Sequence, residues 1–121
     1  ENIFWVLATK IKEGELQNLK DLMKEMNEYT ESNEPGALAY EWFISGDEKY
    51  CHLFEHYKDS AATIIHMKSF MKNFAKRFMS ILEVKSFTVY GKPSDELKGM
   101  LDTMGVIYME SIGGFTRKIN L

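Results

Sequence analysis

A chain of 121 residues with 45% hydrophobic and 27% charged side chains has the composition of one folded domain, unlike disordered, collagen-like or membrane-embedded chains. Its net charge of −3 argues against nucleic-acid binding, because phosphate binding needs a basic surface. Its longest apolar run, Ile3 to Ala8, is far shorter than the ~20 residues of a membrane helix. Cys51 is the only cysteine, which excludes an internal disulfide and a cysteine-rich zinc site and suits a reducing cytoplasm.

The first half of the chain predicts a strand, a helix and a β-hairpin. The segment from about Ile3 to Lys12 is rich in β-branched and aromatic residues, which is typical of a strand. A helix follows and ends at the proline-glycine turn of residues 32–36, because apolar residues recur before that turn at helical spacing: Leu16, Leu19, Leu22, Met23, Met26 and Tyr29. Residues 37–45 and 49–57 then form two strands joined by a Gly-Asp turn.

The second half predicts a long helix, a strand and an extension. The helix begins at Asp59 or Ser60, both good N-caps, and continues to Leu82 with one break expected near Ser69. Residues 83–91 follow as a fourth strand and residues 93–104 as a short helix. Residues 106–119 are expected as another strand or an extended arm.

This order predicts an α+β fold of the ferredoxin-like, split βαβ type, with a four-stranded antiparallel sheet and two helices on one face. We assign residues 1–93 to that core and residues 94–121 to a C-terminal helix and strand that extend the same domain. A strand with one face in water normally alternates between apolar and polar residues. Residues 37–45 do not alternate in this way, which indicates that both faces of this strand are covered. We therefore expect a second protomer packed sheet against sheet, which makes the protein a homodimer and its fold a dimeric α+β barrel.

Two runs, EPGALAYEWFISGDEKYCHLFEHYKDSAATIIHMKSF and EVKSFTVYGKPSDELK, together with the terminal GGF, carry a resemblance over nearly the whole chain. They resemble the antibiotic biosynthesis monooxygenase family, in its quinol monooxygenase-like subgroup. The resemblance implies a dimeric α+β barrel that oxygenates phenols or hydroquinones without metal, flavin or other cofactor. Haem degradation is not expected, because related haem-degrading members carry an Asn on the first strand, where residues 7–9 are Leu-Ala-Thr. The positions that match the family pattern are Glu41, Trp42, Glu55, His66 and Phe70.

Three histidines invite a metal site, but the spacing of two of them argues against one. His52 and His56 lie four residues apart on one strand, which at about 3.3 Å per residue separates them by roughly 13 Å. Side chains that far apart cannot hold one ion, and a thiolate cluster is missing, so no metal is expected.

Cofactor-free oxygenation needs a base, and two side chains are candidates. His66 falls at the edge of the second helix, where an imidazole with an ordinary pKa of about 6.5 could remove a phenolic proton or could simply bond a backbone carbonyl. Glu55 lies on the more apolar face of its strand, so we expect it to be half-buried. It could act there as a base, as the group that orients His66, or as a structural residue. Glu41 lies on the opposite face, which we assign to the dimer interface.

The same reasoning places a substrate pocket between the second helix and the sheet. Its expected borders are Trp42, His66, Phe70 and Phe74. By helical spacing, His66 and Phe70 share one face of the helix. Two polar residues further along, Asn73 and Arg77, fall on the same face. The aromatic residues could also be ordinary core. The substrate-binding candidates are Tyr40, Trp42, Phe70, Asn73, Phe74 and Arg77.

The leading hypothesis is a cofactor-independent monooxygenase that oxidises a small aromatic or hydroquinone-type molecule with O2, with His66 and Glu55 as catalytic residues. The alternative is a non-catalytic dimeric module of the same fold that binds a small hydrophobic molecule. A third interpretation is an isomerase that uses the same two residues only for proton transfer.

Overall fold

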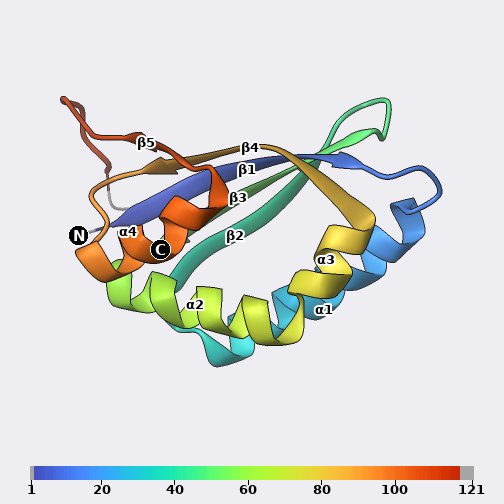
Figure 1. The fold of residues 1–121 in the computed structure, drawn as a ribbon, viewed down its shortest axis with the longest axis horizontal. Coiled ribbons are helices and arrows are strands. Elements are labelled where there is room, and N and C mark those ends of the chain that lie inside the picture. Colours follow the sequence, from blue (N-terminus) through green and yellow to red (C-terminus); the bar gives the residue numbers. More distant parts are fainter. Residues whose placement is uncertain (1, 118–121) are drawn as a thin grey trace.

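The strands form one five-stranded sheet, and the helices lie on one face of it (Figure 1). The computed structural model describes residues 2–117. The strand order is β2-β3-β1-β4-β5, antiparallel except for the parallel pair of β4 and β5. In chain order the elements are β1 (Ile3–Ile11), α1 (Leu16–Asn33), β2 (Ala37–Ile44), β3 (Tyr50–Tyr57), α2 (Ser60–Asn73), α3 (Ala75–Ile81), β4 (Leu82–Tyr90), α4 (Asp95–Leu101), a 3-10 turn (Asp102–Met104) and β5 (Ile107–Met109).

The expected ferredoxin-like α+β fold is confirmed, with one strand more than expected. The short β5 adds to the sheet because it pairs with the edge strand β4, where Tyr90 stands beside Met109. Residues 110–117 of the expected extension form no helix or strand, and residues 118–121 lie outside the described residues.

Helices α1 and α2 begin and pack as the sequence predicts. The periodic residues Leu19, Leu22 and Met26 of α1 are buried. At the start of α2 the Asp59 side chain accepts a hydrogen bond from the Ala62 amide at 2.8 Å, which satisfies one of the free N–H groups of the first turn. No helix within residues 2–117 is long and apolar enough to cross a membrane.

The long second helix breaks at Phe74, so the expectation of a break near Ser69 was wrong. Phe74 has a φ of −130° and separates α2 from α3. Its buried ring packs edge-on against Tyr29 of α1, with ring centres 5.6 Å apart. The break separates two helices rather than two faces, because Phe78 of α3 still packs on Phe70 of α2 with ring centres 5.3 Å apart.

The hairpin of β2 and β3 has the two faces that the sequence predicts. Tyr40 stands opposite Glu55 on the helix-covered face, whereas Glu41 stands opposite Phe54 on the open face. Pairing shifts by one residue at Leu38, a β-bulge that leaves this side chain 54% exposed.

Two apolar clusters fill the space between the sheet and the helices. Leu7, in the middle of β1, packs against both, so the clusters meet there. The first contains Ile11, Leu19, Leu22, Met26, Cys51, Leu53, Phe74, Phe78, Ile81 and Leu82. The second contains Ile3, Trp5, Tyr57, Ala62, Met67, Phe87, Val89, Leu97 and Leu101, and so includes side chains of α2 and α4.

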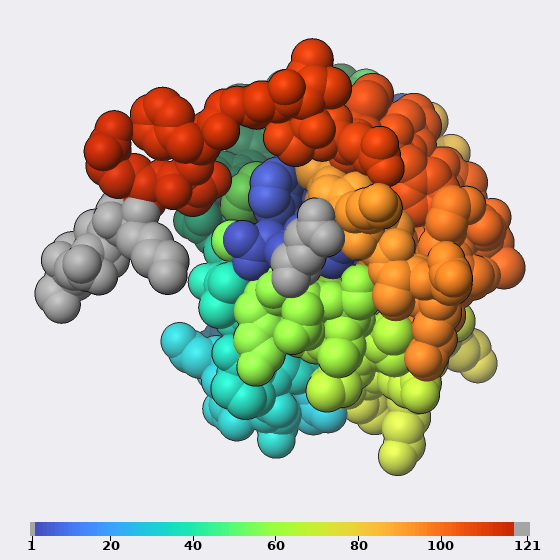
Figure 2. All heavy atoms as spheres, turned by 90° about the vertical axis from the view of Figure 1, so that its left-hand side faces the viewer, coloured from blue at the N-terminus to red at the C-terminus, as the bar shows by residue number. Residues whose placement is uncertain are grey.

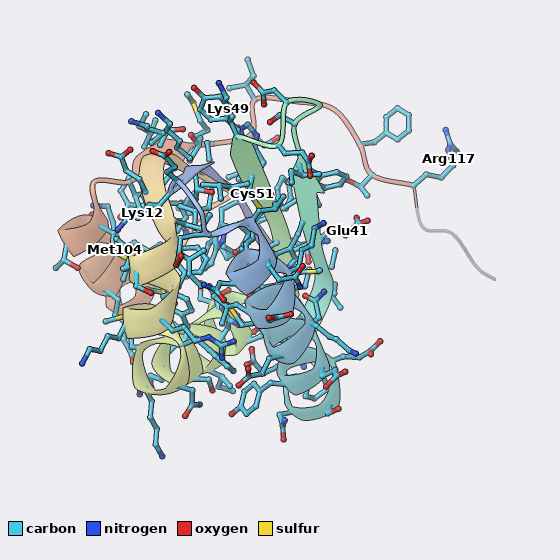
Figure 3. All side chains as sticks on the ribbon, turned by 90° about the vertical axis from the view of Figure 1, so that its right-hand side faces the viewer. Lys12, Glu41, Lys49, Cys51, Met104 and Arg117 are labelled. Carbon is cyan, nitrogen blue, oxygen red and sulfur yellow. The ribbon has the colours of Figure 1, made fainter. Side chains whose placement is uncertain are left out.

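The opposite face of the sheet is apolar and open among the described residues. Phe43 is 54% exposed and Phe54 is 37% exposed. After β5 the chain runs on as an arm, residues 110–117, in which Ile112 and Phe115 are the most exposed large apolar side chains. Figure 2 shows this arm in red standing away from the rest of the molecule, and in Figure 3 Arg117 marks its far end.

Candidate active site

Glu55 lies at the centre of the helix-covered face. β3 runs between β1 and β2, so Glu55 has Trp5 as its cross-strand neighbour on one side and Tyr40 on the other. The residue is 3% exposed, which is deeper than the half-buried position expected from the sequence. A carboxylate this deep needs donors around it to offset the loss of water.

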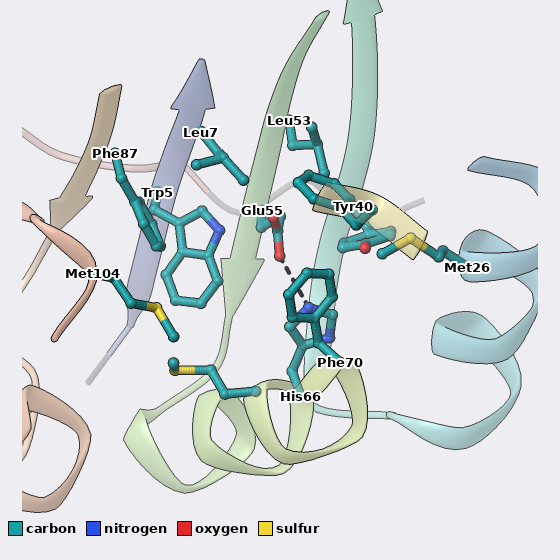
Figure 4. Close-up of a pocket in the computed structure, with 12 residues that line it drawn as sticks. Trp5, Leu7, Met26, Tyr40, Leu53, Glu55, His66, Phe70, Phe87 and Met104 are labelled. Atoms are coloured by element: carbon teal, nitrogen blue, oxygen red, sulfur yellow. Dashed lines mark ion pairs between the residues drawn. The ribbon is translucent and has the colours of Figure 1, made fainter. Parts of the chain in front are cut away.

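His66 supplies one donor from α2 and is itself held between two carboxylates. Its Nε2 lies 3.2 Å from Oε1 of Glu55, and its Nδ1 lies 2.8 Å from Oε1 of Glu34. The residue is 5% exposed. The expectation of a helix-edge histidine was therefore wrong, because α2 turns this side chain directly toward the sheet (Figure 4).

Glu34 is the member of the site that sequence reasoning missed. It follows the last residue of α1, where its amide bonds the Thr30 carbonyl at 2.9 Å. The loop then approaches α2 so closely that a Cβ on Gly36 would lie 2.5 Å from the Cβ of Ala62. A negative charge at the C-terminal end of a helix is electrostatically unfavourable, and this was the one signal in the sequence that Glu34 serves something other than its helix.

The two carboxylates decide the charge of His66. Burial by itself would lower the pKa of His66, but the hydrogen bonds and charges of Glu34 and Glu55 outweigh burial and raise the pKa to about 9. His66 is therefore an imidazolium at neutral pH. Tyr57 completes the cluster: its hydroxyl donates to Oε1 of Glu55 at 2.6 Å. Burial, reinforced by the Glu55 charge, raises the pKa of Tyr57 well above 10, so this hydroxyl stays a donor.

A cavity of about 60 Å³ opens beside this cluster, where the two apolar clusters meet. A single buried water needs about 10–15 Å³, so the space holds a few waters, and an aromatic ring would enter by displacing flexible methionines in the wall. Figure 4 shows β1, β3 and β2 on one side of it and α2 on the other. The lining residues are Trp5, Leu7, Met26, Tyr40, Leu53, Glu55, His66, Met67, Phe70, Phe78, Phe87 and Met104.

The expected pocket between α2 and the sheet is thus present, with two of its four expected borders. His66 and Phe70 line it, but the expectation was wrong for Trp42 and Phe74. The Trp42 indole is held toward α1, because its Nε1 donates to Oδ1 of Asn27 at 2.9 Å. Phe74 is held by its packing on Tyr29 at the helix break.

The two polar residues that helical spacing placed in line with His66 and Phe70 lie away from the cavity. Asn73 is the exposed last residue of α2. Arg77 lies on α3, beyond the break, and its guanidinium donates to Oε2 of Glu25 at 2.6 Å. The prediction that one face of a continuous helix carries both residues beside His66 was therefore wrong, and their role in substrate binding stays a prediction.

The other side chains that could take part in catalysis or bind a metal lie apart from this cluster. His52 and His56 lie on the open face of β3, opposite Ala8 and Phe4 of β1. Burial raises the pKa of the Cys51 thiol to about 11, so this cysteine stays protonated at neutral pH. Within residues 2–117, no group of three or more His, Cys, Asp or Glu side chains is arranged to hold a metal ion.

The fold and the site define a small α+β protein with a buried acid–base cluster beside an apolar cavity. The sequence profile of the antibiotic biosynthesis monooxygenase family matches residues 3–77, more than half of the chain. The chain therefore belongs to the antibiotic biosynthesis monooxygenase family. Glu34, Glu55 and His66 all lie in the matched segment, whereas β4, α4 and β5 lie beyond it. Curated proteins give no match.

Solved structures share this fold. MupZ from Pseudomonas fluorescens is 24% identical, with 97% of this chain and 95% of that chain covered and a TM-score of 0.86. A conserved protein from Methanosarcina mazei Go1 is 22% identical, with 75% and 92% covered and a TM-score of 0.67. A candidate antibiotic biosynthesis monooxygenase from Nitrosomonas europaea is 17% identical, with 75% and 89% covered and a TM-score of 0.66. At these identities the likeness shows the fold, and in MupZ it extends over nearly the whole chain.

Proposed function

We propose that this protein is a monooxygenase that oxidises a small aromatic or hydroquinone-type molecule with O2 and without a cofactor. The observation that carries the proposal is the carboxylate–imidazolium–carboxylate cluster of Glu34, His66 and Glu55, two members of which line an apolar cavity. Family membership supports the reaction class. We further propose that the protein works in the cytoplasm, which its single cysteine supports.

In this proposal Glu55 is the base and His66 is the acid that accompanies it. An imidazolium with a pKa of about 9 has no lone pair to accept a proton at neutral pH. Glu55 is one of the residues that line the cavity, and no hydrogen bond to its Oε2 is found within residues 2–117, so we assign this oxygen as the acceptor of the phenolic proton. His66 and Tyr57 then hold the other oxygen, while Glu34 keeps the imidazole protonated.

The reaction needs no external reductant. Once the phenolic proton has moved to Glu55, the electron-rich anion passes one electron to O2, and the resulting radical pair combines to form a C–O bond. Cleavage of the O–O bond with loss of water leaves a ring carbonyl. The substrate supplies all four electrons, so a hydroquinone and O2 give a hydroxyquinone and one water. The protein contributes proton transfer and the apolar wall that keeps bulk water from the radical pair.

We also propose that the protein acts as a homodimer in which two sheets face each other and form the α+β barrel. The exposed rings of Phe43 and Phe54 on the open face support this arrangement. So do Ile112 and Phe115 of the arm, which would gain cover from a second copy. Sedimentation at micromolar concentration that shows only a 14 kDa species would contradict it.

Acid–base isomerisation is the second candidate, and one observation favours it. A charged acid and a carboxylate base, 3.2 Å apart beside a cavity, can move a proton within a substrate without O2. Oxygen uptake separates the two candidates. With metal-free and flavin-free protein and a panel of hydroquinones, we expect consumption of one O2 for each quinone formed. Substrate turnover at an unchanged rate under argon would contradict the oxygenase proposal and support the isomerase.

A further inference from the structure

The cavity beside Glu55 is smaller than the aromatic ring that the proposed function places in it. Its volume is about 60 Å³, whereas an apolar cavity of about 150 Å³ holds one benzene ring. Protein interiors are close-packed, so the missing space has to come from a side chain of the wall that moves aside. Methionine is well suited to this, because its unbranched side chain has three rotatable bonds.

Three methionines line the cavity, and they differ in how tightly they are held. Met26 is 1% exposed and Met67 is 5% exposed, so each is surrounded by other core side chains. Met104 is only half-buried. A side chain with one flank in solvent can move outward, whereas a fully buried one has to displace its neighbours. Of the three, Met104 therefore has the most room to move.

The turn that carries Met104 is tied to the sheet. Met104 ends the 3-10 turn, and the first residue of that turn, Asp102, accepts a hydrogen bond from the Tyr108 hydroxyl at 2.6 Å. Tyr108 belongs to β5, where it pairs with Val89 of β4. The backbone at this end of the cavity is thus fixed to the edge of the sheet, so a change in the wall comes from rotation of the Met104 side chain.

Met104 lies at the end of the cavity away from the acid–base cluster. In Figure 4 its side chain reaches toward the Trp5 indole, and Trp5 stands between Met104 and Glu55. The strand order agrees with this view. β1, which carries Trp5, lies between β3, which carries Glu55, and β4, whose partner β5 follows the turn of Met104. The size of residue 104 therefore acts on the far end of a ligand and not on the proposed base.

The far end of the cavity also lies outside the segment that the family profile matches. That segment, residues 3–77, contains Glu34, Glu55 and His66 but not Met104. We propose that Met104 is the specificity-determining residue of the cavity: its side chain moves outward to admit one aromatic ring, and its length excludes a second fused ring. This inference rests on the proposed function for the aromatic ligand, and it adds the feature that selects a phenol or hydroquinone of a single ring.

Methionine methyl groups give a direct test, because the chain has eight methionines that report from different places. In proton–carbon NMR spectra of the full chain labelled at these groups, titration with phenol should move the Met104 resonance most, since an aromatic ring shifts the protons held against its face. Met71 of α2 is 56% exposed and lies away from the cavity, so its resonance should stay in place. A moving Met26 or Met67 beside an unmoved Met104 would overturn the inference.

Two variants change the size of the side chain in opposite directions. Met104→Ala should raise the affinity for naphthol relative to phenol by about 10-fold or more, the effect of about one methylene of space in an apolar pocket. Met104→Phe, with a larger and stiffer side chain, should weaken phenol binding by about 10-fold. Met71→Ala is the matched control and should change neither affinity. If Met104→Ala does not fold, Met104→Phe and the methyl shifts of the parent protein still decide the question.

The outcomes separate this inference from the proposed function. An equal ratio of the two affinities in the parent and in folded Met104→Ala would overturn the role of Met104 and leave the proposed function standing. A changed ratio without oxygen uptake from any hydroquinone would overturn the function and leave Met104 as the residue that limits ligand size. Failure of phenol and naphthol to bind the parent and both variants would overturn both.

Discussion

His66 and His56 both pack among aromatic rings, on opposite faces of the same sheet, and their pKa values move in opposite directions. His56 stands on the open face with its ring edge-on to Phe4 at 5.3 Å, and burial lowers its pKa. His66 stands on the covered face beside Tyr40 and Tyr57, where burial acts in the same direction. There the result is a pKa of about 9.

The difference comes from carboxylates and not from the aromatic surroundings. Glu34 and Glu55 each bond one nitrogen of His66, whereas Nε2 of His56 has no partner in the described part of the chain. A buried imidazole is neutral unless something charged compensates it. One face of the sheet is therefore arranged to keep a charge, and the other to offer apolar contact.

The largest expected effect is on catalysis. It is tested by changing two glutamates of neighbouring strands, Glu55 and Glu41, one at a time. Glu55→Gln removes the proposed base and should lower oxygen uptake with hydroquinone by about 10²- to 10⁴-fold. Glu41→Gln, on the open face of β2, should leave the rate unchanged. Figure 3 shows Glu41 at the outer surface of its strand. A Glu55→Gln protein with full activity would remove Glu55 from the mechanism.

The next effect is on stability. His66→Ala leaves two buried carboxylates without their shared cation and should lower the free energy of unfolding by about 3–5 kcal/mol. His56→Ala removes an unpaired ring from the open face and should cost less than about 1 kcal/mol. Urea unfolding of both variants at pH 7 measures this contrast. Equal losses would mean that the carboxylates do not hold His66 as described.

The third effect is the pH dependence of stability. The pKa of His66 in the folded protein, about 9, lies above its unfolded value of about 6.5. Its stabilising contribution is therefore complete below about pH 6.5 and is lost as the pH rises through 9, by up to about 3 kcal/mol. Glu34→Gln should reduce this loss. NMR titration should show His66 titrating above His56, and the reverse order would contradict the site.

The smallest expected effect is on the stability of the protomer, and it follows from a change on the open face. Phe54→Lys should change the free energy of unfolding of an isolated protomer by less than about 1 kcal/mol, because Phe54 is 37% exposed. It should nevertheless turn the proposed dimer into a monomer, because two charges would meet in an apolar interface. Sedimentation of the variant beside the parent checks this. An unchanged assembly state would place the interface elsewhere.

The elements and the faces of the hairpin could be predicted because they depend on neighbours in sequence. Apolar periodicity located α1, the Asp59 cap located the start of α2, and alternation put Glu55 on the covered face and Glu41 on the open one. The break at Phe74 could not be read in this way, since it depends on the packing of that ring against Tyr29, a residue of another helix.

The sequence by itself determined the fold class, the antiparallel arrangement of the first four strands and the presence of Glu55, His66 and Tyr40 near one surface, since each follows from local periodicity or from the resemblance. Only the tertiary structure decided that Glu34 reaches His66. That contact joins residues 32 positions apart and depends on how closely the loop at Gly36 approaches α2. The same packing decided the charge of His66, because a pKa depends on burial and on which carboxylates lie within hydrogen-bonding distance, and neither is a property of sequence neighbours.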